Sequence, residues 1–193
     1  MESLLHSDHR DFEIILVDDG STDDTRHVVA SILKSRQRIR YQRLSRSFGR
    51  DICLSAGIES AIGDFVCTLN PRTDPVDALP KMILECKQHG GIVHGIAENP
   101  EPRNWIRGAT GSLFRRYCRK HLGVDIKHGV SDLRVMSRQA VNALLQIREQ
   151  SRYLRVLTLT LGYHQEFFPY RVISRSEITR QDEWRAELTT AID

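Results

Sequence analysis

The chain has 193 residues, of which 40% are hydrophobic and 27% are charged, a balance that is typical of one globular domain and excludes a disordered chain. No apolar run approaches the roughly 20 residues that cross a bilayer, and the N-terminus has no secretory pattern, so we expect a soluble chain. The four cysteines are scattered without a C-x-x-C pair, which favours reduced core thiols over disulfides or a zinc site.

The net charge of +3 is unevenly distributed along the chain. Residues 101–155 hold twelve Lys/Arg and four Asp/Glu, a net +8, which leaves −5 for the remainder. Such a split indicates an anionic partner for the second half of the chain. Nucleic acid, a membrane surface and a phosphorylated substrate all meet that requirement.

Strands and helices are predicted to alternate along the first half. Apolar runs predict strands at 12–17, 39–44, 64–69 and 92–96, and amphipathic stretches between them predict helices, the first capped by Ser21 or Thr22. This rhythm predicts an α/β fold, a mainly parallel sheet flanked by helices, whose ligands bind at the carboxyl ends of the strands.

Beyond Pro102 the pattern is mostly helical. Residues 103–120 carry six basic and no acidic side chains around an apolar stripe. That pattern fits a solvated helix face and a helix lying on anionic headgroups equally well. A short strand near 133–136, helices at 138–145 and 153–161, and a strand around 166–173 complete the prediction.

Six short motifs then follow one another in order. They are ILVDDGSTDD at 15–24, LSRSFGR at 44–50, SAGIESAIGD at 55–64, TDPVDALP at 73–80, SDLRVMSR at 131–138 and LGY at 161–163. This order resembles family 2 glycosyltransferases of the GT-A fold, in the branch of dolichol-phosphate mannose synthase and undecaprenyl-phosphate glucosyltransferase. The resemblance implies one such domain over 1–175, followed by a C-terminal tail at 176–193.

The resemblance also implies an activity. It is the transfer of a hexose from a UDP- or GDP-sugar to a polyprenyl phosphate, for cell-wall or polysaccharide biosynthesis. The implied location is cytoplasmic, peripheral at the inner face of the cell membrane, with segment 103–120 contacting anionic lipid. A homodimer or a partner transferase stays open, and no nucleic acid is expected because nothing resembles a nucleic-acid-binding module.

Polar residues after the first two strands are candidates for nucleotide-sugar binding. The carboxylates of Asp18 and Asp19 can accept hydrogen bonds from a base edge and a ribose, with Ser21 beside them. Arg46, and after it Arg50, can bind phosphate oxygens through their guanidinium groups. A surface salt bridge is the alternative for Arg50.

The block at 131–138 matches the family's D-F-R motif, with Leu133 in place of the aromatic residue. The resemblance implies that Asp132 and Arg134 are catalytic, with Asp132 near the acceptor phosphate and the transferred sugar. It implies that Arg134, Ser137 and Arg138 bind the acceptor phosphate. A simple structural pairing of these charged side chains is the alternative.

The metal motif departs from the family pattern. The branch normally has D-A-D-L-Q-D-P-P-E, whose first carboxylates hold Mg²⁺ or Mn²⁺, whereas residues 69–77 here read LNPRTDPVD. The metal positions fall on Leu69 and Pro71 or, with a shift of one residue, on Asn70 and Arg72. A hard cation needs anionic oxygens, so the Mg²⁺ or Mn²⁺ that the family implies fits this motif poorly, even at Asn70. Arg72 could instead neutralise the diphosphate of the nucleotide sugar.

Two further departures concern the strands. The arginine that usually follows the fourth strand is absent, with Ala97 near its place. The family's opening strand, with its P-x-Y-N-E block, is not found before Phe12, which predicts a sheet with an exposed edge. Together with the altered metal motif, these departures leave two hypotheses: an active transferase, or a non-catalytic relative that binds nucleotide or lipid phosphate or that partners an active transferase.

Overall fold

The computed structural model describes residues 11–98, 116, 120, 127, 129–147 and 153–172. Two expectations lie almost wholly outside these ranges: the basic segment at 103–120, apart from two of its residues, and the tail at 176–193. Among the described residues, the structure contains no helix with the length and apolar character needed to cross a membrane.

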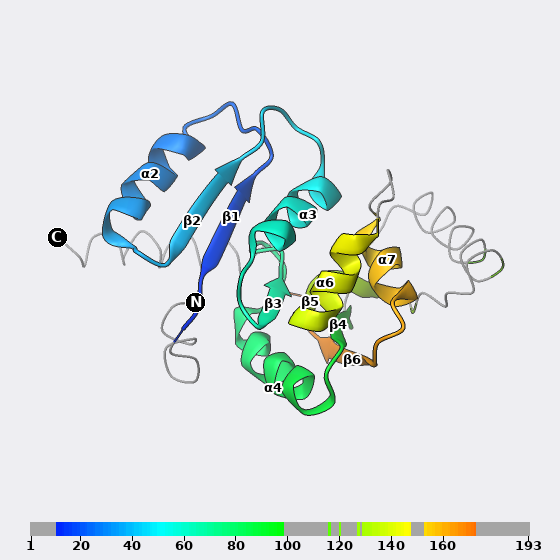
Figure 1. Cartoon of the computed structure of the whole chain (residues 1–193). Coiled ribbons are helices and arrows are strands. Elements are labelled where there is room, and N and C mark those ends of the chain that lie inside the picture. The colour runs from blue at the N-terminus through cyan, green and yellow to red at the C-terminus, as the bar shows by residue number, and fades with distance from the viewer. Residues whose placement is uncertain are drawn as a thin grey trace.

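The first part of the chain forms a two-stranded sheet (Figure 1). Strand β1 (Ile14–Asp18) runs parallel to β2 (Ile39–Arg43), and helix α2 (Thr25–Ser35) connects them. The helix begins later than the expected cap Ser21, because the backbone N–H and the hydroxyl of Ser21 both donate to the Asp18 carboxylate. The cap was therefore predicted too early in the chain.

The remaining strands form a four-stranded mixed sheet in the order β3-β5-β4-β6. Strand β5 is antiparallel to both of its neighbours, whereas β4 and β6 are parallel. The elements in chain order are α3 (Arg50–Ser60), β3 (Phe65–Thr68), the 3-10 turn η1 (Val76–Ala78), α4 (Leu79–His89), β4 (Ile92–Ala97), β5 (Val130–Ser137), α6 (Arg138–Gln146), α7 (Leu154–Thr160) and β6 (Gln165–Tyr170).

Strand β5 lies between β3 and β4, and its first residues lie beside the carboxyl end of β3. Thr68, the last residue of β3, lies opposite Arg134, whereas Phe65, its first residue, lies opposite Ser137. Asp132 therefore lies at the carboxyl end of β3 and Ser137 at its amino end. The predicted α/β architecture with flanking helices is confirmed, and the inserted antiparallel strand makes the sheet mixed.

The alternation of side chains along β5 divides the core between two faces of this sheet. Leu133 and Val135 pack with α4 on one face, and Met136 packs with α6 and α7 on the other. By the same alternation, Asp132 and Arg134 belong to the α7 face. The two charged residues of the predicted site therefore lie beneath α7.

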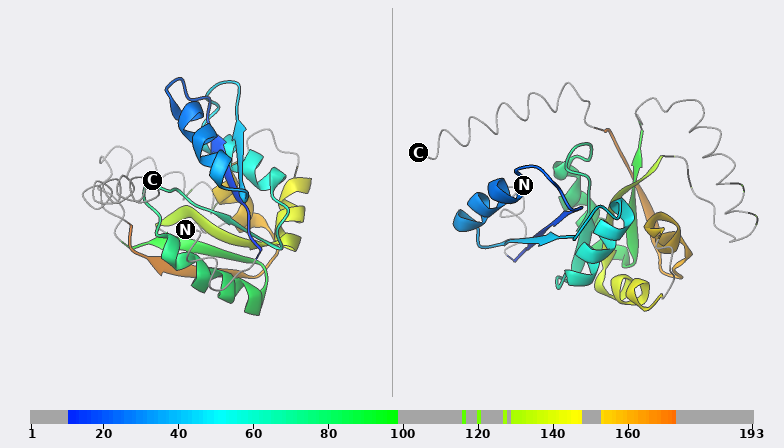
Figure 2. Two further views of the ribbon diagram at one scale, coloured as in Figure 1. Left: turned by 90° about the vertical axis from the view of Figure 1, so that its left-hand side faces the viewer. Right: turned by 90° about the horizontal axis from the view of Figure 1, so that it is seen from above.

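The two sheets are joined through α3, which contacts both β1 and β3. Figure 2 shows the β1–β2 pair and α2 projecting from the side of the four-stranded sheet. Among the described residues, no strand pairs with the edge of β1 away from β2 or with the edge of β3 away from β5. None of the side chains of residues 14–17 is buried, and Leu16 is 36% exposed. The predicted exposed edge is therefore present in the described part of the chain.

Candidate functional site

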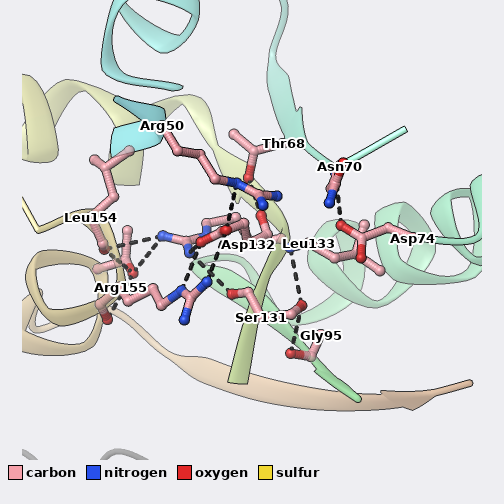
Figure 3. A network of polar contacts seen from close by, with 12 residues as sticks. Arg50, Thr68, Asn70, Asp74, Gly95, Ser131, Asp132, Leu133, Leu154 and Arg155 are labelled. Atoms are coloured by element: carbon pink, nitrogen blue, oxygen red, sulfur yellow. Dashed lines mark hydrogen bonds and ion pairs between the residues drawn. The ribbon is translucent and has the colours of Figure 1, made fainter. Parts of the chain in front are cut away.

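The Asp132 carboxylate is surrounded by three arginines, two of which, Arg50 and Arg155, are labelled in Figure 3. Arg155 of α7 binds it with two parallel hydrogen bonds, from Nε to Oδ1 at 2.8 Å and from Nη2 to Oδ2 at 2.9 Å. Arg50, the first residue of α3, places Nε 2.7 Å from Oδ2, and Arg134 places Nη2 3.6 Å from Oδ1. Asp51 also acts on Arg134 and Arg155, so three cations and two anions give the cluster a net charge of +1, which suits an anionic ligand.

The arginines keep the carboxylate ionised. Burial raises the pKa of Asp132, but the hydrogen bond from Arg155 and the charges of all three arginines outweigh it, so the pKa lies below its usual value. The hydrogen bond to Asp132 in turn raises the pKa of Arg155, and burial lowers the pKa of Arg134 to about 10. Asp132, Arg134 and Arg155 are therefore charged at neutral pH.

Only two of the three arginines face solvent. The Arg134 side chain is 1% exposed, and its guanidinium donates to the Leu154 carbonyl at 3.0 Å and to the Thr158 hydroxyl at 3.1 Å. It therefore holds β5 to α7 instead of reaching outward as a phosphate ligand would. The side chains of Arg50 and Arg155 are 47% and 33% exposed. These two present donors to solvent.

The loop after β3 lies beside this cluster (Figure 3). The Thr68 hydroxyl donates to the backbone carbonyl of Asp132 at 2.6 Å, which fixes the end of β3 against β5. Two residues later, the backbone N–H of Asn70 donates to Asp74 Oδ2 at 2.8 Å. The Tyr170 hydroxyl donates to the other oxygen, Asp74 Oδ1, at 2.8 Å. Asp74 therefore organises the loop.

The donors of this loop do not fit a divalent metal. The amide oxygen of Asn70 is neutral and accepts the backbone N–H of Arg72 at 3.2 Å. Both carboxylate oxygens of Asp74 are engaged, and the residue is 3% exposed. Among the residues that the structure describes, no three His, Cys, Asp or Glu side chains are grouped as metal ligands. A hard cation needs several anionic oxygens free to bind it, and the one carboxylate of this loop is buried and hydrogen-bonded.

The Asp18 carboxylate is occupied by hydrogen bonds to its own loop and to β2. It is 8% exposed and accepts hydrogen bonds from the backbone N–H of Ser21 at 2.8 Å and from the Tyr41 hydroxyl at 2.5 Å. Arg43 lies 3.5 Å away. Burial raises the pKa of Asp18, but these hydrogen bonds and the Arg43 charge have the larger, opposite effect. The pKa of Asp18 therefore lies below its usual value. The carboxylate thus has few lone pairs left for a ligand.

Asp19 holds the start of α3. Its carboxylate accepts the Ser47 hydroxyl at 2.7 Å and the backbone N–H groups of Phe48 and Gly49 at 2.7 and 3.0 Å. A negative charge is favourable at a helix N-terminus. Because Arg50 follows directly, Asp19 also sets the position of that arginine.

The structure brings Arg46 to the same loop, where its guanidinium lies 4.7 Å from the centre of the Phe48 ring. Arg72 is exposed on the loop after β3. Arg46 therefore remains open to solvent at the β1–β2 end of the molecule, while Arg72 lies on the loop next to the Asp132 cluster.

Ser137 and Arg138 lie at the other end of β5, beside the start of β3. The Ser137 hydroxyl caps α6 by accepting the backbone N–H of Ala140 at 3.4 Å, and Arg138 Nε donates to the Gly63 carbonyl at 2.9 Å. Because β5 is extended from Val130 to Ser137, the end of the motif is carried away from Asp132. The structure thus separates Asp132 from the two residues expected to share its phosphate.

Sequence reasoning missed Arg155. It lies outside every recognised motif, yet it is the only charged residue of α7. A single cation in an otherwise apolar and hydroxyl-bearing helix was the available signal, because a buried face admits such a charge only with a partner. That partner is Asp132.

Comparison with known proteins supports the same family. The profile described as Glycosyl transferase family 2 matches residues 1–145. The uncharacterized glycosyltransferase sll0501 of Synechocystis is 31% identical over 157 residues, which cover 81% of this chain and 49% of the relative. The undecaprenyl-phosphate 4-deoxy-4-formamido-L-arabinose transferase of Pseudomonas savastanoi is 29% identical over 161 residues, covering 82% and 47%. The chain thus spans about half the length of these relatives.

Solved structures share the fold at low sequence identity. The mannosyltransferase PcManGT of Pyrobaculum calidifontis, in complex with GDP-Man and Mn²⁺, gives a TM-score of 0.52 at 15% identity, over 86% of this chain and 49% of that one. S. aureus TarS 1–349 gives a TM-score of 0.54 at 12% identity, over 88% and 52%. The matched profile, the relatives and the fold agree, and the chain belongs to glycosyl transferase family 2.

Proposed function

We propose that this chain transfers a sugar from a nucleotide sugar to a polyprenyl phosphate. The observation that carries the proposal is the pair of solvent-facing arginines, Arg50 and Arg155, fixed on Asp132 at the carboxyl end of β3. Two comparisons support it: one relative is named an undecaprenyl-phosphate sugar transferase, and one structural neighbour holds GDP-Man. Both ligands are phosphates, which a net positive cluster attracts.

In the proposed reaction, an oxygen of the acceptor phosphate attacks the anomeric carbon of the sugar. The new carbon–oxygen bond forms as the bond to the nucleoside diphosphate breaks, so the configuration inverts and the diphosphate takes the electron pair. The attacking phosphate is already ionised, so no strong base is needed. Arg50 and Arg155 stabilise the phosphate charges, and Asp132 orients both guanidiniums before the ligand arrives. Arg134 is a positioning residue beneath Asp132.

The nucleotide is proposed to bind at the loops that follow β1 and β2. Arg46 is exposed there and can reach a phosphate, while Asp19 holds the loop against α3. Asp18 and Ser21 shape the turn by binding each other. Because the acceptor is a lipid, we further propose that the basic segment 103–120 contacts anionic headgroups at the inner face of the cell membrane.

The test is a transfer assay with the full chain, UDP- and GDP-sugars and a short polyprenyl phosphate, with and without Mn²⁺, followed by mass spectrometry. Arg155→Gln should lower the rate by about 100-fold or more, as removal of a charge-stabilising donor does. Lys81→Gln is the matched control, since Lys81 is exposed on α4, against the other face of the sheet. If the chain showed no transfer and no donor hydrolysis under any of these conditions, the proposal would be contradicted.

A second candidate is a non-catalytic family member that binds nucleotide or lipid phosphate. The observation that favours it is the loop after β3, whose Asn70 and Asp74 oxygens are already engaged. Calorimetry with UDP and GDP separates the two candidates. Binding without turnover supports the second, and turnover excludes it.

A further inference from the structure

Two features of the site bear on how a diphosphate is neutralised. The single carboxylate of the loop after β3, Asp74, is buried and already accepts hydrogen bonds on both oxygens, and the exposed Arg72 on the same loop adds a positive charge. A divalent cation would therefore meet repulsion where it needs ligands. The Asp132 cluster beside the loop is also net positive, because its three arginines outnumber the carboxylates of Asp132 and Asp51.

The cluster is also built to receive an anion. Arg155 contacts Asp132 through Nε and Nη2, and Arg50 contacts it through Nε. The other Nη groups of both side chains can donate to a ligand. Guanidinium groups bind phosphate oxygens in pairs, and these two are held in place by a carboxylate that is itself 4% exposed. The donors are thus arranged before binding.

We propose that this site binds the diphosphate of its donor without a divalent cation, and that Arg50 and Arg155 supply the charge neutralisation. The inference rests on the proposed function, because it assumes a diphosphate ligand. It differs from the Mn²⁺-bound structural neighbour in assigning the role of the metal to side chains of this chain.

The experiment is calorimetric titration of the full chain with inorganic pyrophosphate, UDP and GDP, in EDTA and in millimolar Mn²⁺. We expect binding in EDTA that Mn²⁺ does not tighten. Arg50→Gln and Arg155→Gln should each weaken it by about tenfold or more, as the loss of a charged hydrogen bond does. Lys81→Gln should leave it unchanged. Because Arg50 is half exposed, its variant tests the site with little risk to folding, which thermal unfolding will check.

The outcomes separate this inference from the proposed function. Binding that requires Mn²⁺ overturns the metal-free site and leaves the transferase proposal standing. No binding of any of the three probes, with or without Mn²⁺, overturns both. Binding in EDTA that survives both arginine substitutions places the anion elsewhere and overturns the assignment to Arg50 and Arg155.

A gain-of-function variant gives an independent measurement. Asn70→Asp with Arg72→Asp adds two carboxylates to the loop and removes its cation. The new carboxylate at position 70 can still accept the backbone N–H at position 72, so the turn should persist. Electron paramagnetic resonance should then detect Mn²⁺ bound by the double variant and free Mn²⁺ with the native chain. If the native chain binds Mn²⁺ as tightly as the double variant does, the inference is overturned.

Discussion

Each of the two sheets contains a strand rich in apolar residues, but the sheets bury these residues to different degrees. In the four-stranded sheet, Ile92 and Val135 are completely enclosed between helices. In the two-stranded sheet, none of the residues 14–17 of β1 is buried, although their sequence is a continuous apolar run. Burial is thus decided by what covers a strand, since the residue types are alike.

The same difference holds for the charged residues. Asp132 is held by side chains from two helices, α3 and α7, whereas Asp18 is held by its own loop and by the neighbouring strand β2. The four-stranded sheet therefore supplies the rigid part of the candidate site. The two-stranded sheet is connected to the candidate site through the start of α3, where Asp19 binds the turn before Arg50.

The buried cation of the larger sheet should show the largest effect. Arg134→Met removes a fully buried partner of Asp132 and should lower the free energy of unfolding by about 3–5 kcal/mol. Arg43→Met, at a 39% exposed side chain 3.5 Å from Asp18, should cost under about 1 kcal/mol. Urea unfolding measures both. Equal losses would show that the two sheets do not differ in this respect.

Apolar truncation makes the same comparison with one residue type. Ile92→Ala opens a cavity in the enclosed sheet and should cost about 2–5 kcal/mol. Ile15→Ala, in the partly exposed β1, should cost less than half as much. The two midpoints of urea unfolding decide the matter, and a larger loss at Ile15 would mean that β1 is covered in solution.

A buried histidine should make the larger sheet sensitive to pH. His94 on β4 is fully buried, and burial, together with the nearby Arg134 charge, lowers its pKa from 6.5 to about 3. The unfolded chain then binds the proton first, so stability should fall as pH drops from about 6.5 to 3, by up to about 1.4 kcal/mol per pH unit. His94→Gln should remove this slope in unfolding experiments across the range. The exposed His27→Gln is the control and should retain it.

The link between the sheets should give a small effect on stability. Asp19→Ala removes the acceptor at the start of α3, and Asp23→Ala removes a similar acceptor at the start of α2. Each should cost about 1 kcal/mol. Only Asp19→Ala should also weaken pyrophosphate binding, because Arg50 follows the turn that Asp19 holds. Calorimetry on both variants will show whether that selectivity exists.

The elements were predictable because each is a local pattern. The strand expected at 92–96 is observed at Ile92–Ala97, and the helix expected at 138–145 is observed at Arg138–Gln146. The direction of β5 was not predictable, because it depends on the long connection between β4 and β5 and leaves no mark on the strand itself. Ser137 and Arg138 were grouped with Asp132 by the family resemblance, although the extended strand places Ser137 at the opposite end of β5.

The candidate site was only partly predictable for a related reason. Asp132 belongs to a recognisable block, and its ionisation could be anticipated from the arginine beside it. Its bidentate partner Arg155 comes from α7, and no spacing in the sequence connects the two residues. Arg134 was expected at a ligand, but alternation along β5 and the packing of α7 enclose it.

The pairing of Asp132 with Arg155 also defines the smallest piece of this chain worth making. The family match ends at residue 145, before α7 and β6. A fragment cut there would keep Asp132 without its bidentate partner, and Asp74 without the hydroxyl of Tyr170. Truncations intended to preserve the anion site must therefore extend through Tyr170.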